Sequence, residues 1–150
     1  MSLSAPPPVT NIHVQTKYIP PTQPALPPLA VQVTSLIGSY MVWVGVTEEP
    51  AENVHLAPVQ GFLLKDWACA MPPSNSNVAI PPSATSLFRS SSSDTALPMA
   101  QRLAKRFKKQ IFLSVDVPPS FVTMGEGSKL MFAVEKAVVD TLKELEQTPS

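Results

Sequence analysis

The sequence predicts an α+β protein with a mainly antiparallel sheet and helices on one face of it. Several short stretches alternate between apolar and polar residues with a period of two, which is typical of half-buried strands. Two longer stretches in the C-terminal third instead repeat their apolar residues at helical spacing. Their order along the chain is strands, helix, strand, helix, and this order favours the α+β class.

The first half of the chain supplies three predicted strands. Residues 10–18 alternate strictly, residues 29–37 form a second β-prone run, and residues 40–46 form a run that is apolar on both faces. Gly38 and Ser39 separate the last two runs, so we expect a hairpin that leads into a central strand. One face of the first strand would carry Thr10, Ile12, Val14, Thr16 and Tyr18.

The second half supplies three more β-prone stretches. Residues 67–71 predict a short buried strand, residues 84–88 resume β character, and residues 111–117 alternate before Pro118 and Pro119 end the run. Trp43 and Trp67 each lie within such an apolar strand, so we expect both indoles in the core.

Two amphipathic helices complete the pattern. The first runs from Asp94 to about Lys109, with Asp94 and Thr95 as the N-terminal cap and Ala100, Leu103, Ala104 and Phe107 on one side. The second follows Ser128, which can cap it, and carries a stripe of apolar residues. This stripe comprises Leu130, Met131, Val134, Ala137, Val138, Leu142 and Leu145.

The length of 150 residues, of which 18 are prolines, predicts a single domain over residues 1–150. The proline-rich arm at residues 20–28 is expected to be a solvated connector. Residues 47–66, 72–82 and 89–93 lack clear periodicity and are expected to be flexible surface insertions.

Composition narrows the class of protein. The formal net charge is zero, which argues against nucleic acid or anionic lipid as a partner, and no apolar run is long enough to cross a membrane. The N-terminus shows no signal or transit peptide pattern, and the single cysteine, Cys69, cannot form an internal disulfide. We therefore expect a protein of the cytoplasm or nucleus.

No enzymatic constellation is evident. Cys69 could act as a nucleophile with His13 or His55 as base, but its apolar surroundings favour a small buried hydrophobe. No pair of these residues has metal-ligand spacing. The glycines at 125 and 127 are better explained by a turn than by phosphate binding. We expect no catalytic, cofactor-binding or metal-binding residue.

One charged feature could carry function, a basic cluster on the first helix. It could dock an acidic protein surface, or it could simply favour the negative end of the helix; RNA binding is a weaker alternative because aromatic interleaving is missing. The candidate partner-binding residues are Arg102, Lys105, Arg106 and Lys109.

Three segments resemble the proteasome assembly chaperone 4 family, in a version similar to fungal members. The first is Tyr40-Met-Val-Trp-Val-Gly45. The second joins Ala84-Thr-Ser-Leu-Phe88 and Ser93-Asp-Thr95 to Ala100-Gln-Arg-Leu-Ala-Lys105. The third is Lys109-Gln-Ile-Phe-Leu-Ser114 with the closing helix. They follow family order over about half of the chain.

This resemblance implies a small six-stranded sheet with two helices and a non-enzymatic role in 20S proteasome assembly. It implies pairing with a sister similar to proteasome assembly chaperone 3, and holding of an alpha-type subunit, which we expect to be alpha-type 5, while the alpha ring forms. The alternative is a generic α+β adaptor domain of the longin or roadblock kind. Composition does not separate these two hypotheses.

Overall fold

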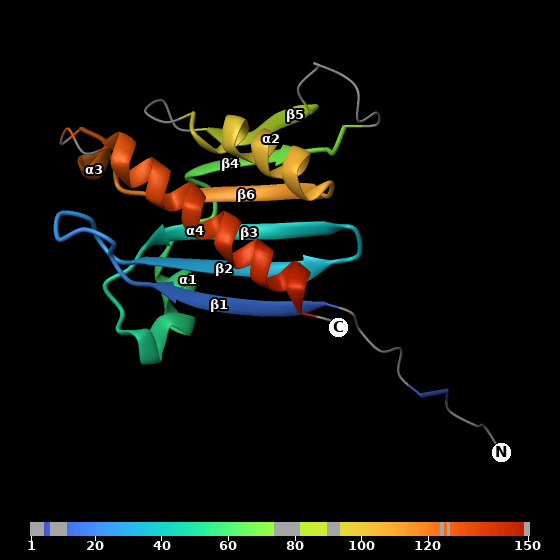
Figure 1. Cartoon of the computed structure of the whole chain (residues 1–150), viewed down its shortest axis with the longest axis horizontal. Coiled ribbons are helices and arrows are strands. Elements are labelled where there is room, and N and C mark those ends of the chain that lie inside the picture. The colour runs from blue at the N-terminus through green and yellow to red at the C-terminus, as the bar shows by residue number, and fades with distance from the viewer. Residues whose placement is uncertain are drawn as a thin grey trace.

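The architecture is a six-stranded sheet with its two long helices on one side (Figure 1). The computed structural model describes residues 5–6, 12–73, 82–89, 94–123, 125 and 127–148. The strands are β1 (His13–Ile19), β2 (Leu29–Leu36), β3 (Ser39–Val46), β4 (Asp66–Ala70), β5 (Ala84–Arg89) and β6 (Gln110–Asp116). The helices are the 3-10 helix η1 (Ala51–Leu56), α1 (Ala57–Gln60), α2 (Ala96–Phe107), α3 (Pro119–Thr123) and α4 (Gly127–Gln147).

The strand order is β1-β2-β3-β6-β4-β5. All neighbouring pairs are antiparallel except β3 and β6, which run parallel. The prediction of an α+β fold with a mainly antiparallel sheet is confirmed. The predicted hairpin is also present, because β2 and β3 pair directly and β3 then lies in the middle of the sheet beside β6.

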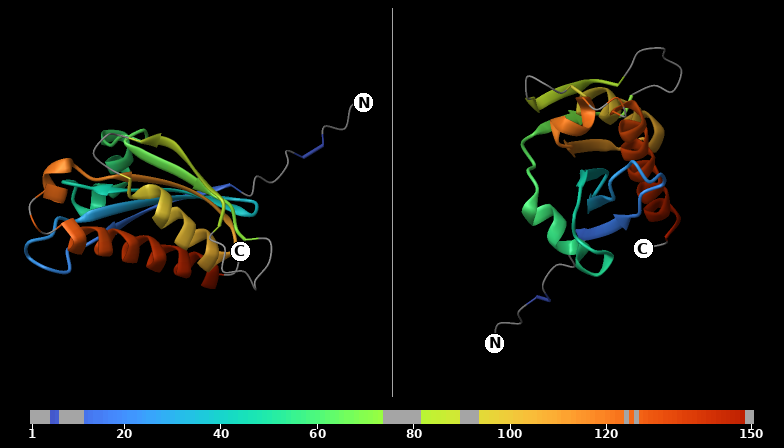
Figure 2. Two further views of the ribbon diagram at one scale, coloured as in Figure 1. Left: turned by 90° about the horizontal axis from the view of Figure 1, so that it is seen from above. Right: turned by 90° about the vertical axis from the view of Figure 1, so that its left-hand side faces the viewer.

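The main core lies between the sheet and the helices α2 and α4, which cover the same face (Figure 2). In the four inner strands, β2, β3, β6 and β4, most of the alternate residues that point to this face are apolar and buried, and the apolar stripes of the two helices pack on them. Fully buried members from both layers are Val31, Val33, Val42, Val44, Ile111, Leu113, Met99, Leu103, Leu130, Val134, Val138 and Leu142.

The start of α2 differs from the sequence prediction. Thr95 is the N-cap residue, as predicted, but its side chain makes no capping hydrogen bond, and the carboxylate of Asp94 lies 3.7 Å from Arg89 at the surface. The side chain of Asp66, at the start of β4, instead accepts the backbone N–H groups of Thr95 and Ala96 at 2.9 and 3.0 Å. A sequence pattern shows only neighbouring capping residues, and this cap comes from another element.

Residues 47–66 are not the featureless loop that their weak periodicity predicted. They contain η1 and α1, and they cross the face of the sheet that α2 and α4 leave free (Figure 2). Ala57 packs there against Ala30 and Trp43, forming a second small core. These turns are too short to show a helical repeat, so no periodic signal for them is present in the sequence.

The proline-rich arm at residues 20–28 is likewise more than a solvated connector, because Leu26 is buried in the main core. Residues 74–81 and 90–93, which make up most of two predicted insertions, lie outside the described residues. Among the residues that are described, no helix is long and apolar enough to cross a membrane.

Candidate protein-interaction surface

The helix-free face of the sheet carries a row of side chains to which every strand contributes one residue. Val42 and Leu113 point into the helix-covered core, so their neighbours Met41 and Phe112 point the other way. The register continues this row across all six strands through directly paired residues. We call it the open row: Val14, Thr34, Met41, Phe112, Cys69 and Thr85.

The open row is largely apolar and accessible. Val14 is 61% exposed, Thr85 is exposed, and the four inner members are half-buried by their neighbours in the sheet. Ile12 and Met71, which lie directly beyond the ends of β1 and β4, are also exposed. A solvated sheet face normally carries polar side chains, so the apolar run of Met41, Phe112 and Cys69 at the centre of this row makes it a candidate surface for protein binding.

The other half of the same face is covered by the crossing segment at residues 47–66. Asp116 anchors this segment: its carboxylate accepts the N–H of Phe62 at 2.6 Å and lies 3.3 Å from the ammonium of Lys65. Ser114 Oγ donates to the carbonyl of Leu63 at 2.8 Å. Phe62 itself is 68% exposed, so the crossing segment carries a further accessible apolar group.

The basic cluster predicted as a partner site is divided by the structure. Arg102 forms a bidentate ion pair with Glu135 of α4, with N···O distances of 2.7 and 3.0 Å. The ammonium group of Lys109 lies 3.0 Å from the hydroxyl of Tyr40 on β3. It also lies 3.1 Å from the carboxylate of Glu146, which is on α4 like Glu135. Two of the four predicted residues therefore fix α4 to the rest of the molecule.

The other two, Lys105 and Arg106, are exposed and form no ion pair among the described residues. They share the outer face of α2 and remain the accessible part of the cluster. The role predicted for the cluster in partner binding stays a prediction, now centred on these two side chains.

The residues weighed as a nucleophile and its base lie on separate elements. Cys69 is on β4, His13 on β1 and His55 on η1, and three strands separate β1 from β4, which is about 19 Å at the usual strand spacing. Cys69 is half-buried on the helix-free face and not in the core as predicted, and its Sγ lies 3.4 Å from Gln110 Nε2. No group of three metal-ligating side chains occurs among the described residues.

Trp43 and Trp67, both predicted to be core residues, also lie on the helix-free face. They belong to the next row of the register, in which each pairs with Ser114. Trp43 is buried beneath the crossing segment, as expected of a core residue, whereas Trp67 is only partly buried.

The open row was missed at the sequence level, although the alternation of residues 10–18 was a partial signal for it. That alternation correctly groups Val14, Thr16 and Tyr18 on one face of the strand. It does not indicate which face of the sheet the helices cover. Their partner residues Thr34, Gln32 and Ala30 lie on the helix-free side. Strand order and register were needed to join six separate residues into one surface.

A one-sided α+β sheet with an accessible apolar row on its free face is suited to binding another protein. Comparison with known proteins identifies the family within this class. Residues 28–117 match the family described as Proteasome assembly chaperone 4. The chain belongs to this family, which is one of proteasome assembly chaperones.

A solved structure supports the same fold. The chain is similar to one in the crystal structure of a novel chaperone complex for yeast 20S proteasome assembly, with a TM-score of 0.60 and 18% sequence identity. The alignment covers 89% of this chain and 96% of that one. A search of curated proteins found no match.

Proposed function

We propose that this chain is a non-enzymatic chaperone of 20S proteasome assembly that works as one half of a heterodimer. Its partner is a sister chaperone similar to proteasome assembly chaperone 3, and together they hold an alpha-type subunit, alpha-type 5, while the alpha ring forms. Family membership supports the assembly role. The observation that carries the pairing is the apolar open row on the helix-free face of the sheet.

The physical argument concerns the area left uncovered. A sheet whose second face is apolar is stabilised when another layer packs on it, and two sheets commonly pack face to face at about 10 Å. Met41 and Phe112 lie at the centre of the open row, on the neighbouring strands β3 and β6. Large apolar residues at the centre of an interface usually dominate its binding free energy.

The decisive experiment measures binding of the sister chaperone to the double variant Met41→Asp with Phe112→Asp by isothermal titration calorimetry. We expect affinity to fall by at least about a hundredfold, because two charges would be buried without partners. The matched control is Phe132→Asp, which changes an exposed aromatic residue on α4 and should leave pairing unchanged.

Wild-type affinity in a correctly folded double variant would refute pairing through the open row. If the double variant does not fold, Val14→Asp tests the same surface at its exposed edge. That single change should weaken pairing in the same direction, and no change in affinity would again refute the proposal.

The client is tested separately. Mass spectrometry of proteins captured by the tagged chain should find alpha-type subunits, with alpha-type 5 among them, and no mature proteasome activity. Capture of other complexes without proteasome subunits would instead favour the adaptor hypothesis.

Cys69→Ala should retain assembly activity, since the thiol has no chemical role in this proposal. Fluorescence microscopy of the tagged chain should place it in the cytoplasm or nucleus.

The accessible basic pair contributes to docking in this proposal. Exposed charges mainly set association rates and their salt dependence. Lys105→Glu with Arg106→Glu should slow formation of the chaperone–client complex most at low ionic strength. Rates measured at two salt concentrations test this, and unchanged rates would show that the two side chains form an ordinary solvated helix face. Arg102 is left intact because its reversal would repel Glu135.

A further inference from the structure

A large groove runs along α4 on the helix-covered side of the molecule. It has a volume of about 790 Å³ and lies between α4, the end of β1 and the proline-rich arm. This volume lies in the range of ligand-binding sites. Its walls combine side chains from three elements, among them Lys17, Ile19, Leu26, Phe132, Lys136 and Lys143.

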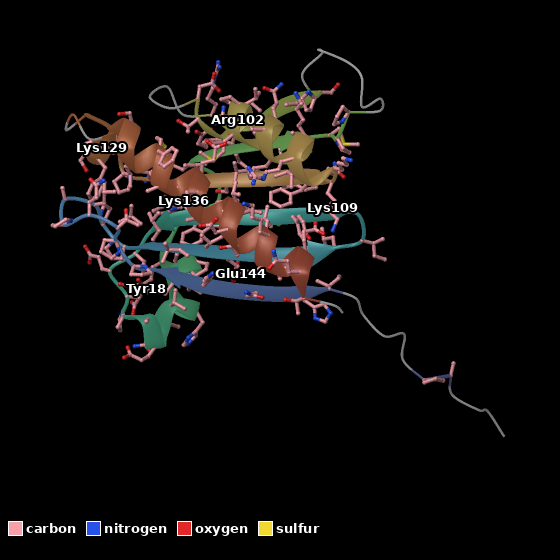
Figure 3. All side chains as sticks on the ribbon, viewed as in Figure 1. Tyr18, Arg102, Lys109, Lys129, Lys136 and Glu144 are labelled. Atoms are coloured by element: carbon pink, nitrogen blue, oxygen red, sulfur yellow. The ribbon has the colours of Figure 1, made fainter. Side chains whose placement is uncertain are left out.

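The wall formed by α4 carries lysines at regular intervals. Lys129, Lys136 and Lys143 all line the groove and are seven residues apart. Seven residues are nearly two helical turns, so the three lysines lie on one side of the helix at steps of about 10.5 Å. Figure 3 shows Lys129 and Lys136 following each other along α4.

The groove has a positive balance of charge. Lys17 and Glu144 form an ion pair with each other across it, and among the described residues that line it the only other acidic one is Asp140. Lys136 and Lys143 therefore share this wall of the groove with a single carboxylate that is not in a described ion pair, that of Asp140. Lys136 and Lys143 are exposed and make no ion pair within the described part of the chain.

The groove also offers an apolar contact. Phe132 is 72% exposed, and its position on α4 falls between Lys129 and Lys136. Ile19 and Leu26 supply apolar surface on the opposite wall. A single exposed aromatic ring is common on protein surfaces, but a partner whose apolar side chain covers this ring within the groove gains hydrophobic free energy.

We propose that this groove binds an extended acidic peptide segment of a partner protein. In the polyproline II form of an extended chain, three residues complete one turn and rise about 9.3 Å, so acidic side chains three residues apart lie on one side and match the lysine steps closely. One large apolar side chain of the segment packs on Phe132. The site lies on the opposite side of the sheet from the open row, so it is independent of sister-chaperone pairing.

Charge complementarity selects this occupant. The first eleven residues of the chain itself contain no aspartate or glutamate, so they do not match the lysines. The zero net charge of the whole chain gives no general attraction for nucleic acid. A segment with spaced carboxylates and an apolar side chain satisfies both the lysines and Phe132.

The test is fluorescence anisotropy with two labelled synthetic peptides of identical composition. One has glutamates at every third position around a central phenylalanine, and the other has its glutamates adjacent. We expect the spaced peptide to bind the full chain at least about tenfold more tightly. Lys136→Glu with Lys143→Glu should weaken its binding by at least about tenfold, and Phe132→Ser should weaken it without changing the salt dependence.

The matched control is Arg89→Glu with Lys108→Glu, which makes the same change of net charge at two exposed sites outside the groove. It should leave binding within about twofold of wild type. Equal losses in both double variants, equal affinity for the two peptides, or no binding of the spaced peptide would each overturn the proposal. So would displacement of the peptide by a single-stranded oligonucleotide whose own binding depends on Lys136 and Lys143. Circular dichroism checks that every variant is folded.

Discussion

The carboxylate of Asp66 caps the helix that begins 30 residues later at Ala96. It accepts the backbone N–H groups of Thr95 and Ala96 in a site where Asp66 is only 2% exposed. The first N–H groups of a helix have no partner within the helix, and a carboxylate also interacts favourably with the positive end of the helix dipole. This contact couples the start of β4 to the position of α2.

Asp66→Ala is therefore expected to lower the free energy of unfolding by about 1–3 kcal/mol, because it leaves buried N–H groups without an acceptor. Urea unfolding followed by circular dichroism measures this loss. The control is Asp94→Ala, which removes only an exposed ion pair with Arg89 and should cost less than about 1 kcal/mol. A larger loss of stability for Asp94→Ala than for Asp66→Ala would instead support Asp94 as the cap, as predicted from the sequence.

Lys108→Gly is expected to stabilise the protein by about 0.5–1 kcal/mol. Lys108 ends α2 in the left-handed conformation, with φ 55° and ψ 38°, which glycine adopts without the steric cost of a Cβ. Lys105→Gly is the contrasting change in the middle of the same helix and should destabilise it by about 1 kcal/mol. Urea midpoints compare the two variants, and destabilisation by Lys108→Gly would contradict the prediction.

The cluster of Tyr40, Lys109 and Glu146 should make stability fall at alkaline pH. Burial raises the pKa of Tyr40 above its ordinary value of 10.0, although the hydrogen bond from Lys109 opposes this. Burial alone would lower the pKa of Lys109, but its hydrogen bonds to Tyr40 and Glu146 outweigh that effect and raise it. Both groups thus hold a proton more tightly in the folded chain.

The sign of the pH effect follows from linkage. The pKa values of Tyr40 and Lys109 are both higher in the folded state than in the unfolded state. Their contribution to the free energy of unfolding is therefore fully present below about pH 10, and it is lost as the pH rises through the pKa values of the folded state. Thermal unfolding measured between neutral and alkaline pH should show a steeper loss for wild type than for Tyr40→Phe. Tyr18→Phe removes the other tyrosine as a control, and identical profiles for the two variants would contradict the prediction.

Gly61→Ala should loosen the crossing segment. A Cβ at this position would lie 2.6 Å from Asp116 Oδ2 and 2.6 Å from the Trp43 ring, so the segment or the indole must move. We expect a loss of about 1–3 kcal/mol and a change in tryptophan fluorescence. Val59→Ala, at an exposed site on the same segment, should leave both measurements nearly unchanged, and an equal effect there would refute this packing argument.

Much of the fold could be predicted from the sequence because its signals are local. The alternation at residues 111–117 and the apolar spacing of Ala100, Leu103 and Ala104 each follow from the repeat of one element. The structure places a strand and a helix there, with boundaries within about two residues of those predicted. The turns of η1 and α1 lack such a repeat, and they were missed for that reason.

What the sequence by itself determined was the class of fold, the elements with a clear repeat and, through the resemblance, the family. Only the tertiary structure decided which residues meet. It joined Val14 to Thr85 through the open row, engaged Arg102 and Lys109 with α4, and aligned the α4 lysines along the groove. The physical reason is that periodicity reports the side on which a residue lies within its own element. Strand order, register and helix packing determine what that side faces, and these depend on contacts between residues far apart in the chain.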